Sequence, residues 1–255
     1  MQFGLCCDFS EFEYALAAGY DYVEGALSGL ASAPDLERYR GLPIEATNIF
    51  FPSSIRLFGE ERTPYLEYAR GALAKAGELG VKIAVVGSGA VRRAPDEEDI
   101  EEYEDAFADI ASELADIADE FGITVAPESL NRSETNIGND LASLANRLLK
   151  RGVSYTADSY HVLYEWNAKH PDQPAPPESL FDTQLPFAPV HVHVATLPRV
   201  APVPGDPKLV GFVRRLQSLG YDGRVSLECQ RGSSVEELSA ALKNLQALFR
   251  GSQPE

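Results

Sequence analysis

Side chains that can bind a metal ion occur at the ends of four successive apolar, β-branched segments in the second half of the chain. They are Glu128, Asp158, His193 and Glu228. Three carboxylates brought together would repel one another and raise one another's pKa unless a cation neutralised them. Three carboxylate oxygens and one imidazole form a hard donor set, which favours Mn²⁺ or Mg²⁺ and admits Co²⁺ or Zn²⁺. A single glutamate at a strand end usually caps a helix or forms an ion pair, so it is the conjunction that predicts one divalent ion, with Mn²⁺ favoured.

The same set could move protons. A divalent ion that chelates a carbonyl oxygen and the adjacent hydroxyl oxygen acidifies the carbon-bound hydrogen between them. Glu128 and Glu228, on well separated strands, would flank the chelated substrate from opposite faces. One would remove the proton to leave a metal-bound cis-enediolate, and the other would return it to the opposite face. This chemistry predicts an epimerase, or an isomerase if the proton returns to the neighbouring carbon.

Two histidines lie on one strand-like segment, residues 190–194 (VHVHV). Because side chains alternate along a strand, His191 and His193 point to the same side. His193 lies closer to the end of the segment, so we predict His193 as the metal ligand and His191 as a structural residue one layer deeper, with a hydrogen bond. His161, three residues beyond Asp158, could be a metal ligand, a donor to substrate or a structural histidine.

Eight apolar or β-branched segments alternate with helical patterns along the chain. The predicted strands are residues 3–7, 22–27, 44–51, 81–86, 123–126, 154–157, 190–194 and 225–227. Predicted helices include residues 63–80, 100–121, 140–150 and 234–249, and capping boxes are predicted at 10–13 and 234–237. Asp8, Glu24, Asn48 and the sequence Gly87-Ser88-Gly89 follow the first four strands.

Eight strand–helix units in 255 residues match an α/β fold of the (β/α)₈ TIM-barrel type. An open doubly wound sheet would usually carry a glycine-rich loop after its first strand, and residues 6–10 contain no glycine. We therefore predict a single TIM-barrel domain over residues 1–255, with residues 251–255 as a frayed tail. The ends of the strands would meet at one rim of the barrel, where function resides in this fold.

Composition limits the partners of the protein. The net charge is −17, and residues 96–120 contain 13 acids and no base. This balance argues against nucleic acid, because neutralising phosphates requires clustered Lys and Arg. There is no apolar run of about 18 residues, no basic start typical of a signal peptide and no cysteine pattern typical of disulfides, so we expect a cytoplasmic protein with no membrane span.

Several motifs surround the predicted ligands. They are Glu-x-x-Asn-Arg at 128–132, Asp-x-x-His with a trailing acid at Asp158, His161 and Glu165, His-x-His at 191–193 followed by Arg199, Gly-Tyr-x-Gly at 220–223 before Ser-Leu-Glu at 226–228, and Gly-Ser-Gly at 87–89 near Arg92. In these motifs the chain resembles the sugar isomerase/epimerase barrels related to xylose isomerase. This superfamily includes ketose 3-epimerases, hydroxypyruvate isomerases, inosose dehydratases and endonuclease IV. The resemblance covers the last five strands well and the first third of the chain loosely.

The resemblance implies a small-molecule sugar or sugar derivative as substrate, and a possible homo-oligomer. It implies that His161 and Arg199 hold and polarise substrate oxygens, and that Glu134 and Asn131 belong to the substrate-binding set. Most relatives carry an acid at the position of Thr196, where it supports the site without binding the metal. This departure leaves the predicted ligand set complete.

Other interpretations of the residues and of the function stay open at this point. Arg231, at the start of the last helix, could bind a phosphate or carboxylate, although Glu236 and Glu237 oppose an anion there. Arg92, expected on an exposed loop, could contact a charged substrate. On the same metal site, expulsion of a β-hydroxyl would give a dehydratase of the inosose-dehydratase type. A non-catalytic sugar-binding barrel and an endonuclease are less favoured alternatives.

Overall fold

The computed structural model describes residues 1–58, 63–95 and 99–250, so the predicted tail at 251–255 lies outside the described residues. Eight parallel strands form one sheet with the order β5-β4-β3-β2-β1-β8-β7-β6. A parallel bridge between Glu128 and Thr156 joins the two ends of this order and brings the sheet close to a closed ring. The predicted (β/α)₈ barrel is confirmed.

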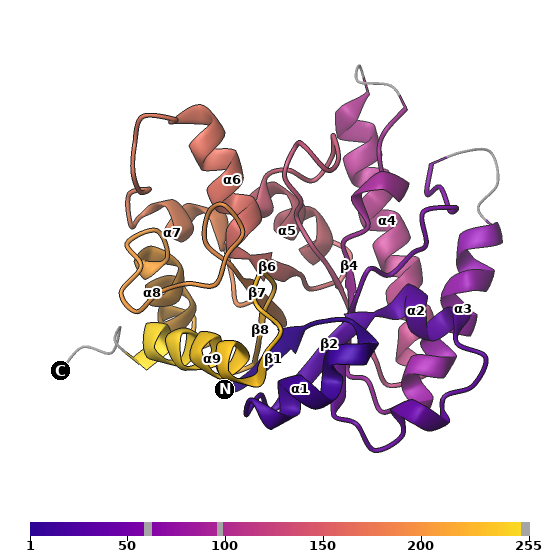
Figure 1. Cartoon of the computed structure of the whole chain (residues 1–255). Coiled ribbons are helices and arrows are strands. Elements are labelled where there is room, and N and C mark those ends of the chain that lie inside the picture. The colour runs from indigo at the N-terminus through magenta and orange to yellow at the C-terminus, as the bar shows by residue number, and fades with distance from the viewer. Residues whose placement is uncertain (59–62, 96–98, 251–255) are drawn as a thin grey trace.

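All eight predicted strands are present, with bounds that differ from the prediction by about three residues at most. They are β1 (Gln2–Cys6), β2 (Tyr22–Ala26), β3 (Ile44–Asn48), β4 (Ile83–Val86), β5 (Thr124–Pro127), β6 (Thr156–Asp158), β7 (His191–Val194) and β8 (Arg224–Leu227). The helices surround the strands (Figure 1): α1 (Phe12–Ala17), α2 (Leu27–Ser32), α3 (Thr63–Glu78), α4 (Ile100–Asp119), α5 (Leu141–Leu149), α6 (Ser159–Lys169), α7 (Leu180–Gln184), α8 (Val210–Ser218) and α9 (Val235–Arg250).

The two predicted capping boxes have different outcomes. At α9, the Ser234 N–H donates to the Glu237 carboxylate and the Glu237 N–H donates to the Ser234 hydroxyl, both at 3.2 Å. The box predicted at 10–13 is wrong by two residues. Asp8 is the N-cap of a 3₁₀ turn before α1, and its N–H donates to Glu11 at 3.4 Å. Aspartate caps helices as well as serine does, so the earlier residue starts the turn.

The acidic helix α4 packs its apolar stripe inward, with Phe107, Ile110 and Leu114 buried. Its outer acids are partly paired with arginines in and around the neighbouring helices: the Nε of Arg151, just after α5, lies 2.6 Å from Asp109, for example. Exposed pairs of this kind contribute little to stability. Among the described residues, none of the helices has both the length and the apolar character needed to cross a membrane.

The barrel interior has an apolar layer and a polar layer. The apolar layer consists of Tyr22, Ala46, Ile83, Val85 and Ala126. The Tyr22 ring fills this layer so closely that a Cβ atom at Gly4 would lie 2.2 Å from it. Nearer the C-terminal ends of the strands lie the buried polar side chains Glu24, His193 and Ser226, and His191, also buried, lies two residues earlier on β7. Register places Asp158 opposite His193 and His193 opposite Ser226, so these strands present polar groups at one level.

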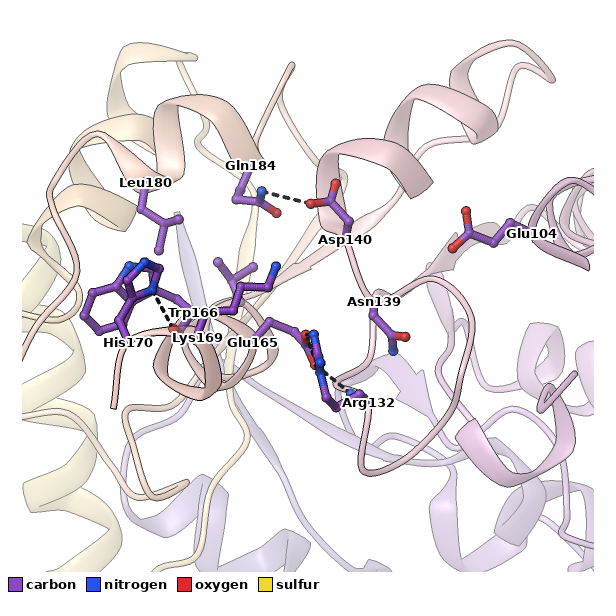
Figure 2. Close-up of a pocket in the computed structure, with 11 residues that line it drawn as sticks. Glu104, Arg132, Asn139, Asp140, Glu165, Trp166, Lys169, His170, Leu180 and Gln184 are labelled. Carbon is purple, nitrogen blue, oxygen red and sulfur yellow. Dashed lines mark hydrogen bonds and ion pairs between the residues drawn. The ribbon is translucent and has the colours of Figure 1, made fainter. Parts of the chain in front are cut away.

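Outside the barrel, α6, α7 and the loop after β5 border a cavity of about 400 Å³ (Figure 2). An ion pair crosses its floor. The Glu165 carboxylate, which is nearly buried, accepts hydrogen bonds from the backbone N–H and the guanidinium of Arg132 at 2.5–3.1 Å. This pair ties the loop after β5 to α6. The loop therefore has a fixed position beside the barrel mouth.

Candidate active site

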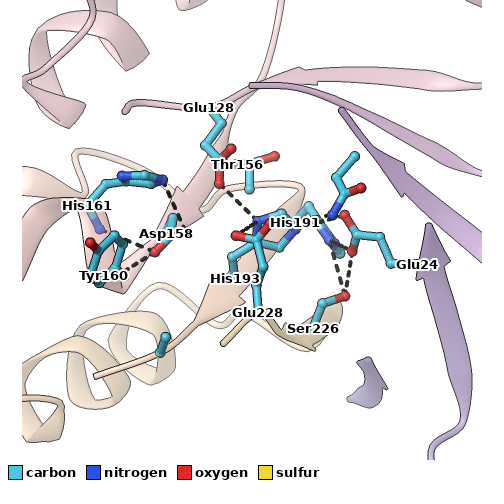
Figure 3. Close-up of polar contacts among 12 residues, drawn as sticks. Glu24, Glu128, Thr156, Asp158, Tyr160, His161, His191, His193, Ser226 and Glu228 are labelled. Atoms are coloured by element: carbon cyan, nitrogen blue, oxygen red, sulfur yellow. Dashed lines mark hydrogen bonds and ion pairs between the residues drawn. The ribbon is translucent and has the colours of Figure 1, made fainter. Parts of the chain in front are cut away.

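The C-terminal ends of β5, β6, β7 and β8 bring together the four side chains predicted to bind a metal ion. Glu128, Asp158, His193 and Glu228 each offer one ligand atom, and these atoms lie within 4.8 Å of one another. His193 Nδ1 lies 2.9 Å from a Glu128 oxygen and 3.5 Å from a Glu228 oxygen (Figure 3). Three carboxylates and one imidazole nitrogen in this arrangement fit a hard divalent cation.

The electrostatics of the cluster also fit a cation. Burial raises the pKa of Glu128, and burial together with the neighbouring carboxylates raises the pKa of Asp158 well above its usual value. Glu228 differs from the expectation that all three carboxylates have a raised pKa. Burial alone would raise its pKa, but contacts with His193 and Arg199 outweigh burial and lower it. Carboxylate repulsion is thus present in the cluster and only partly relieved by the protein's own cations.

Local structure positions two of the carboxylates. Asp158 is the N-cap of α6: its Oδ1 accepts the N–H of Tyr160 at 2.5 Å and that of His161 at 3.4 Å. This cap leaves Oδ2 for the cluster. Glu128 extends over Gly87, where a Cβ atom would lie 2.7 Å from a Glu128 oxygen. The glycine after β4 therefore leaves the space that the Glu128 side chain occupies.

His161 is held as a neutral donor. The backbone N–H of Asn131 donates to its Nδ1 at 3.1 Å, which leaves the ring hydrogen on Nε2. Burial lowers the pKa of His161 to about 3. Nε2 is buried, faces Asp158 across 3.6 Å and has no hydrogen-bond partner within the described part of the chain. A buried N–H group without a partner is costly, and a substrate oxygen would satisfy it.

Arg199 links two acids at the mouth. Its guanidinium lies 3.0 Å from Glu228 and 3.2 Å from Glu134, and it stacks over the Tyr160 ring at 4.8 Å. Asn131 also contacts this group, because its amide donates to Glu134 at 3.1 Å. The predicted substrate-binding residues thus form one continuous set beside the metal ligands.

A tight turn aims Arg199 into the site. The Arg199 N–H donates to the Thr196 carbonyl at 2.6 Å, and the Thr196 N–H donates to the Val200 carbonyl at 3.0 Å. Arg199 itself has a left-handed φ of +88°. Thr196, where the resemblance led us to expect an acid, closes this turn with its backbone, and its buried hydroxyl has no partner among the residues that the structure describes.

The two arginines predicted as possible anion-binding residues are not free surface cations. Arg92 is fully buried over the Phe107 ring, rather than on an exposed loop, and burial lowers its pKa to about 10. Arg231 lies 3.3 Å from both oxygens of Glu11 and 3.2 Å from the Cys6 carbonyl. At both positions the guanidinium lies near protein acceptors or acids. These contacts do not test whether either residue binds an anion, so anion binding stays a prediction.

A cleft of about 450 Å³ opens onto Glu228 and Arg199 from the side of β1, β2 and β3. Asn48 lines it and donates to Glu228 at 3.4 Å. The cleft has the size of a small-molecule site. Of the four clustered side chains, Glu228 is the one that borders this cleft.

Glu24 is the residue of this site to which the sequence assigned no role. It is fully buried on β2 and lies within hydrogen-bond distance of both His191 and His193. Burial alone would raise its pKa, but the two imidazoles outweigh burial and hold it well below the usual value. Its inward direction follows from strand alternation with Tyr22, but its pairing with β7 and β8 depends on the strand order, in which β1 pairs with both β2 and β8.

Known structures of similar shape support the fold. D-psicose 3-epimerase from Clostridium cellulolyticum H10, solved with D-tagatose, is 18% identical with a TM-score of 0.75, and the match covers 98% of this chain and 99% of that one. 3-Keto-D-glucoside 4-epimerase from E. coli is 19% identical, with a TM-score of 0.70 and coverage of 96% and 99%. The IOLI protein, solved with a zinc atom, is 18% identical, with a TM-score of 0.66 and full coverage of both chains (100% each).

No curated protein matches the chain with statistical significance. A sequence model of one protein family, by contrast, matches residues 12–249, which is nearly the whole chain. The chain belongs to the xylose isomerase-like TIM barrel family.

Proposed function

We propose that this protein is a divalent-metal-dependent enzyme that epimerises or isomerises a sugar or sugar derivative. The observation that carries the proposal is the convergence of three carboxylates and one imidazole, within 4.8 Å, beside an unpartnered buried donor. The similar structures named as epimerases of psicose and of a ketoglucoside support the substrate class.

The ligand set proposed for the ion is Glu128, Asp158, His193 and Glu228. When bound, the ion would polarise the carbonyl and hydroxyl oxygens of the substrate and acidify the hydrogen on the carbon between them. Mn²⁺ is favoured by the oxygen-rich donors, and Mg²⁺, Co²⁺ and Zn²⁺ are tolerated by the same set.

Glu128 and Glu228 are the proposed acid and base. They come from β5 and β8, on either side of the β6–β7 pair that carries the other two ligands. One carboxylate removes the carbon-bound proton, and the other delivers a proton from the opposite side. His161 Nε2–H donates to a substrate oxygen, and Arg199, held by Glu134, orients a second oxygen.

Metal analysis and isotope exchange test this function. The purified protein is first analysed for bound metal and then incubated in D₂O with a panel of ketoses and aldoses. We expect one divalent ion per chain and deuterium at a carbon next to the carbonyl of the substrate that turns over. Release of water without stereochemical inversion would favour the dehydratase alternative, and absence of both metal and exchange over the panel would contradict the proposal.

Variants at the two glutamates assign the roles. Glu128→Gln and Glu228→Gln should each lower turnover by at least a hundredfold, because general acid–base groups contribute about 10²- to 10⁴-fold. Glu178→Gln, at an exposed acid that pairs with Arg214 far from the site, is the matched control and should leave turnover unchanged. Near-normal turnover of either glutamate variant would refute its role.

A further inference from the structure

Directly beneath the candidate metal ligands lies a carboxylate that the proposed chemistry does not use. Glu24 Oε1 lies 2.9 Å from His193 Nε2 (Figure 3). Glu24 Oε2 lies 2.8 Å from His191 Nε2 and accepts the Ser226 hydroxyl at 2.6 Å. All four side chains are fully buried. One carboxylate therefore gathers three polar partners inside the barrel.

The two nitrogens of His193 face different groups. Nδ1 faces the carboxylates of Glu128 and Glu228, whereas Nε2 faces Glu24. A hydrogen bond from Nε2–H to a carboxylate fixes the tautomer that leaves the Nδ1 lone pair available to a cation. It also fixes the plane of the ring. The Glu24 carboxylate is therefore placed where a hydrogen bond would set both properties that a histidine ligand needs.

Glu24 is itself held in place from across the barrel. It comes from β2, while His191 and His193 come from β7 and Ser226 from β8. The Ser226 hydroxyl also contacts the Tyr22 hydroxyl at 2.8 Å. The contacts join strands that are not hydrogen-bonded neighbours of β2, so partners from two other strands hold the carboxylate beside His193.

A purely structural role is a poor explanation for this carboxylate. Removing an ion from water into a protein interior is costly, and apolar residues of similar volume often serve stability as well or better. This barrel also uses that alternative, because its apolar layer contains Tyr22, two residues before Glu24 on the same strand. A buried acid next to a candidate metal ligand is better explained by its effect on that ligand.

A second metal site is the competing explanation. Cys6, Glu24 and His193 also offer ligand atoms close together. However, both Glu24 oxygens already have partners: one lies within hydrogen-bond distance of His193, and the other contacts His191 and the Ser226 hydroxyl. The contacts favour a hydrogen-bonded support over an inner ion.

We propose that Glu24 is a positioning residue that orients His193 for the metal ion, with His191 and Ser226 holding Glu24 in turn. The inference rests on the proposed function, because it concerns the same metal site. It predicts that Glu24 acts on metal affinity without touching metal or substrate.

The test measures metal binding directly. Chelator-treated wild type, Glu24→Gln and Glu24→Asp are titrated with Mn²⁺ by calorimetry and with Co²⁺ by absorption spectroscopy. We expect both variants to bind about 10- to 100-fold more weakly than wild type, because outer partners of metal ligands contribute at this scale. The Co²⁺ spectrum should also change, since the ring that supplies Nδ1 is no longer fixed.

Thr47→Val is the matched control. Thr47 is fully buried on β3, and its hydroxyl has no partner among the described residues, so the change alters the interior without touching the Glu24 contacts. Its metal affinity should equal that of wild type. Unfolding midpoints of the metal-free proteins distinguish lost affinity from lost fold, and Glu24→Asp, which keeps the charge, serves if Glu24→Gln does not fold.

The outcomes separate the two proposals. Wild type that binds no divalent ion overturns the proposed function. Wild-type binding with unchanged affinity and spectrum in a folded Glu24 variant overturns the positioning role and leaves the proposed function in place. Two ions per chain, the second lost on Glu24 substitution, would assign Glu24 as a ligand and also overturn the positioning role.

Discussion

At the scale of single residues, burial decides what His161 can do. Its pKa is lowered to about 3, so the ring stays neutral as the pH falls from 8 to 5 and takes up a proton only far below that range. We therefore expect no limb of the pH–rate profile between pH 5 and 8 to come from His161. His161→Leu should lower kcat/KM about a hundredfold, as loss of one donor to a developing charge does, without changing the shape of the profile.

The matched variant for this prediction is His161→Gln, which keeps an N–H donor and should retain more activity than His161→Leu. The measurement is kcat/KM from pH 5 to 9 for the three proteins. A limb between pH 6 and 7 that disappears in both variants would mean that the imidazole titrates during the reaction, against the prediction.

A second prediction at the scale of single residues concerns Gly87. A Cβ atom there would meet the end of the flexible Glu128 side chain at 2.7 Å, so Gly87→Ala should displace the carboxylate and disturb the backbone little. We expect about tenfold weaker metal binding, measured by calorimetry, with a small change in unfolding free energy. If Gly87→Ala instead unfolds much of the protein, and the folded fraction binds metal normally, then the prediction that it displaces the Glu128 carboxylate is wrong.

Gly71→Ala is the control for Gly87→Ala. Gly71 lies on an exposed position of α3, and a Cβ there would meet nothing within 4 Å. Alanine is favoured over glycine inside helices by about 0.5–1 kcal/mol, so this variant should be slightly more stable and should bind metal normally.

At the scale of elements, the residues at the strand ends were predictable from the sequence. The contacts that buried side chains make inside the protein were not. The four candidate ligands follow from periodicity, because the ends of parallel strands must meet at one rim. The burial of Arg92 and the pairing of Arg231 with Glu11 depend on contacts across loops, which leave no period in the sequence. Glu24 illustrates the same limit, since its partners lie on β7 and β8, which are distant from β2 in the sequence and are not paired with it in the sheet.

Helices were predictable where one face is apolar. The stripe of α4 is clear, and its buried residues recur at steps of three and four. In α6, by contrast, buried polar residues such as His161 and Glu165 interrupt the pattern, because this helix packs against both the barrel and the neighbouring loop. Buried polar side chains next to the candidate site thus hide the apolar periodicity of this helix.

The Arg132–Glu165 pair predicts an asymmetric response. Arg132 is half exposed and Glu165 is nearly buried, with exposed side-chain fractions of 56% and 9%. Arg132→Met leaves Glu165 with only the backbone N–H of residue 132, and stranding a buried acid costs about 1–3 kcal/mol. We expect a loss near the lower end of that range in urea unfolding, together with lower kcat/KM, because the same loop carries Asn131 and Glu134.

Arg214→Met is the matched control for the Arg132 variant. Arg214 pairs with Glu178 and Asp182, and all three side chains are about half exposed. Surface pairs of this kind contribute about 0–1 kcal/mol, so the control should lose little stability and no activity. Equal losses in the two variants would contradict a special role for the buried carboxylate.

At the scale of the whole molecule, an acidic protein also places three carboxylates close together at the mouth of its barrel. The net charge is −17, and the cluster at the mouth adds three carboxylates with one imidazole. Such a field attracts cations and disfavours polyanions such as nucleic acids. The molecule therefore folds around a local repulsion that a bound cation would relieve, which links metal binding to stability.

Metal removal tests that link. At a free Mn²⁺ concentration of about 100 times Kd, binding to the native state alone adds about 2.7 kcal/mol. For a protein of this size that corresponds to a rise in Tm of about 5–10 °C over the chelator-treated form, measured by calorimetry. The rise should grow with the logarithm of the Mn²⁺ concentration. A Tm that ignores Mn²⁺ would contradict a native-state site.

Asp158→Asn separates the charge of the site from its structure. Asparagine caps helices as well as aspartate, so α6 should keep its N-cap, while the cluster loses one carboxylate. We expect the metal-free variant to melt at the same temperature as metal-free wild type or higher, because one repulsive charge is gone. Added Mn²⁺ should then raise its Tm far less than that of wild type. A variant that is less stable without metal and still gains the full shift with Mn²⁺ would place the cation elsewhere in the barrel.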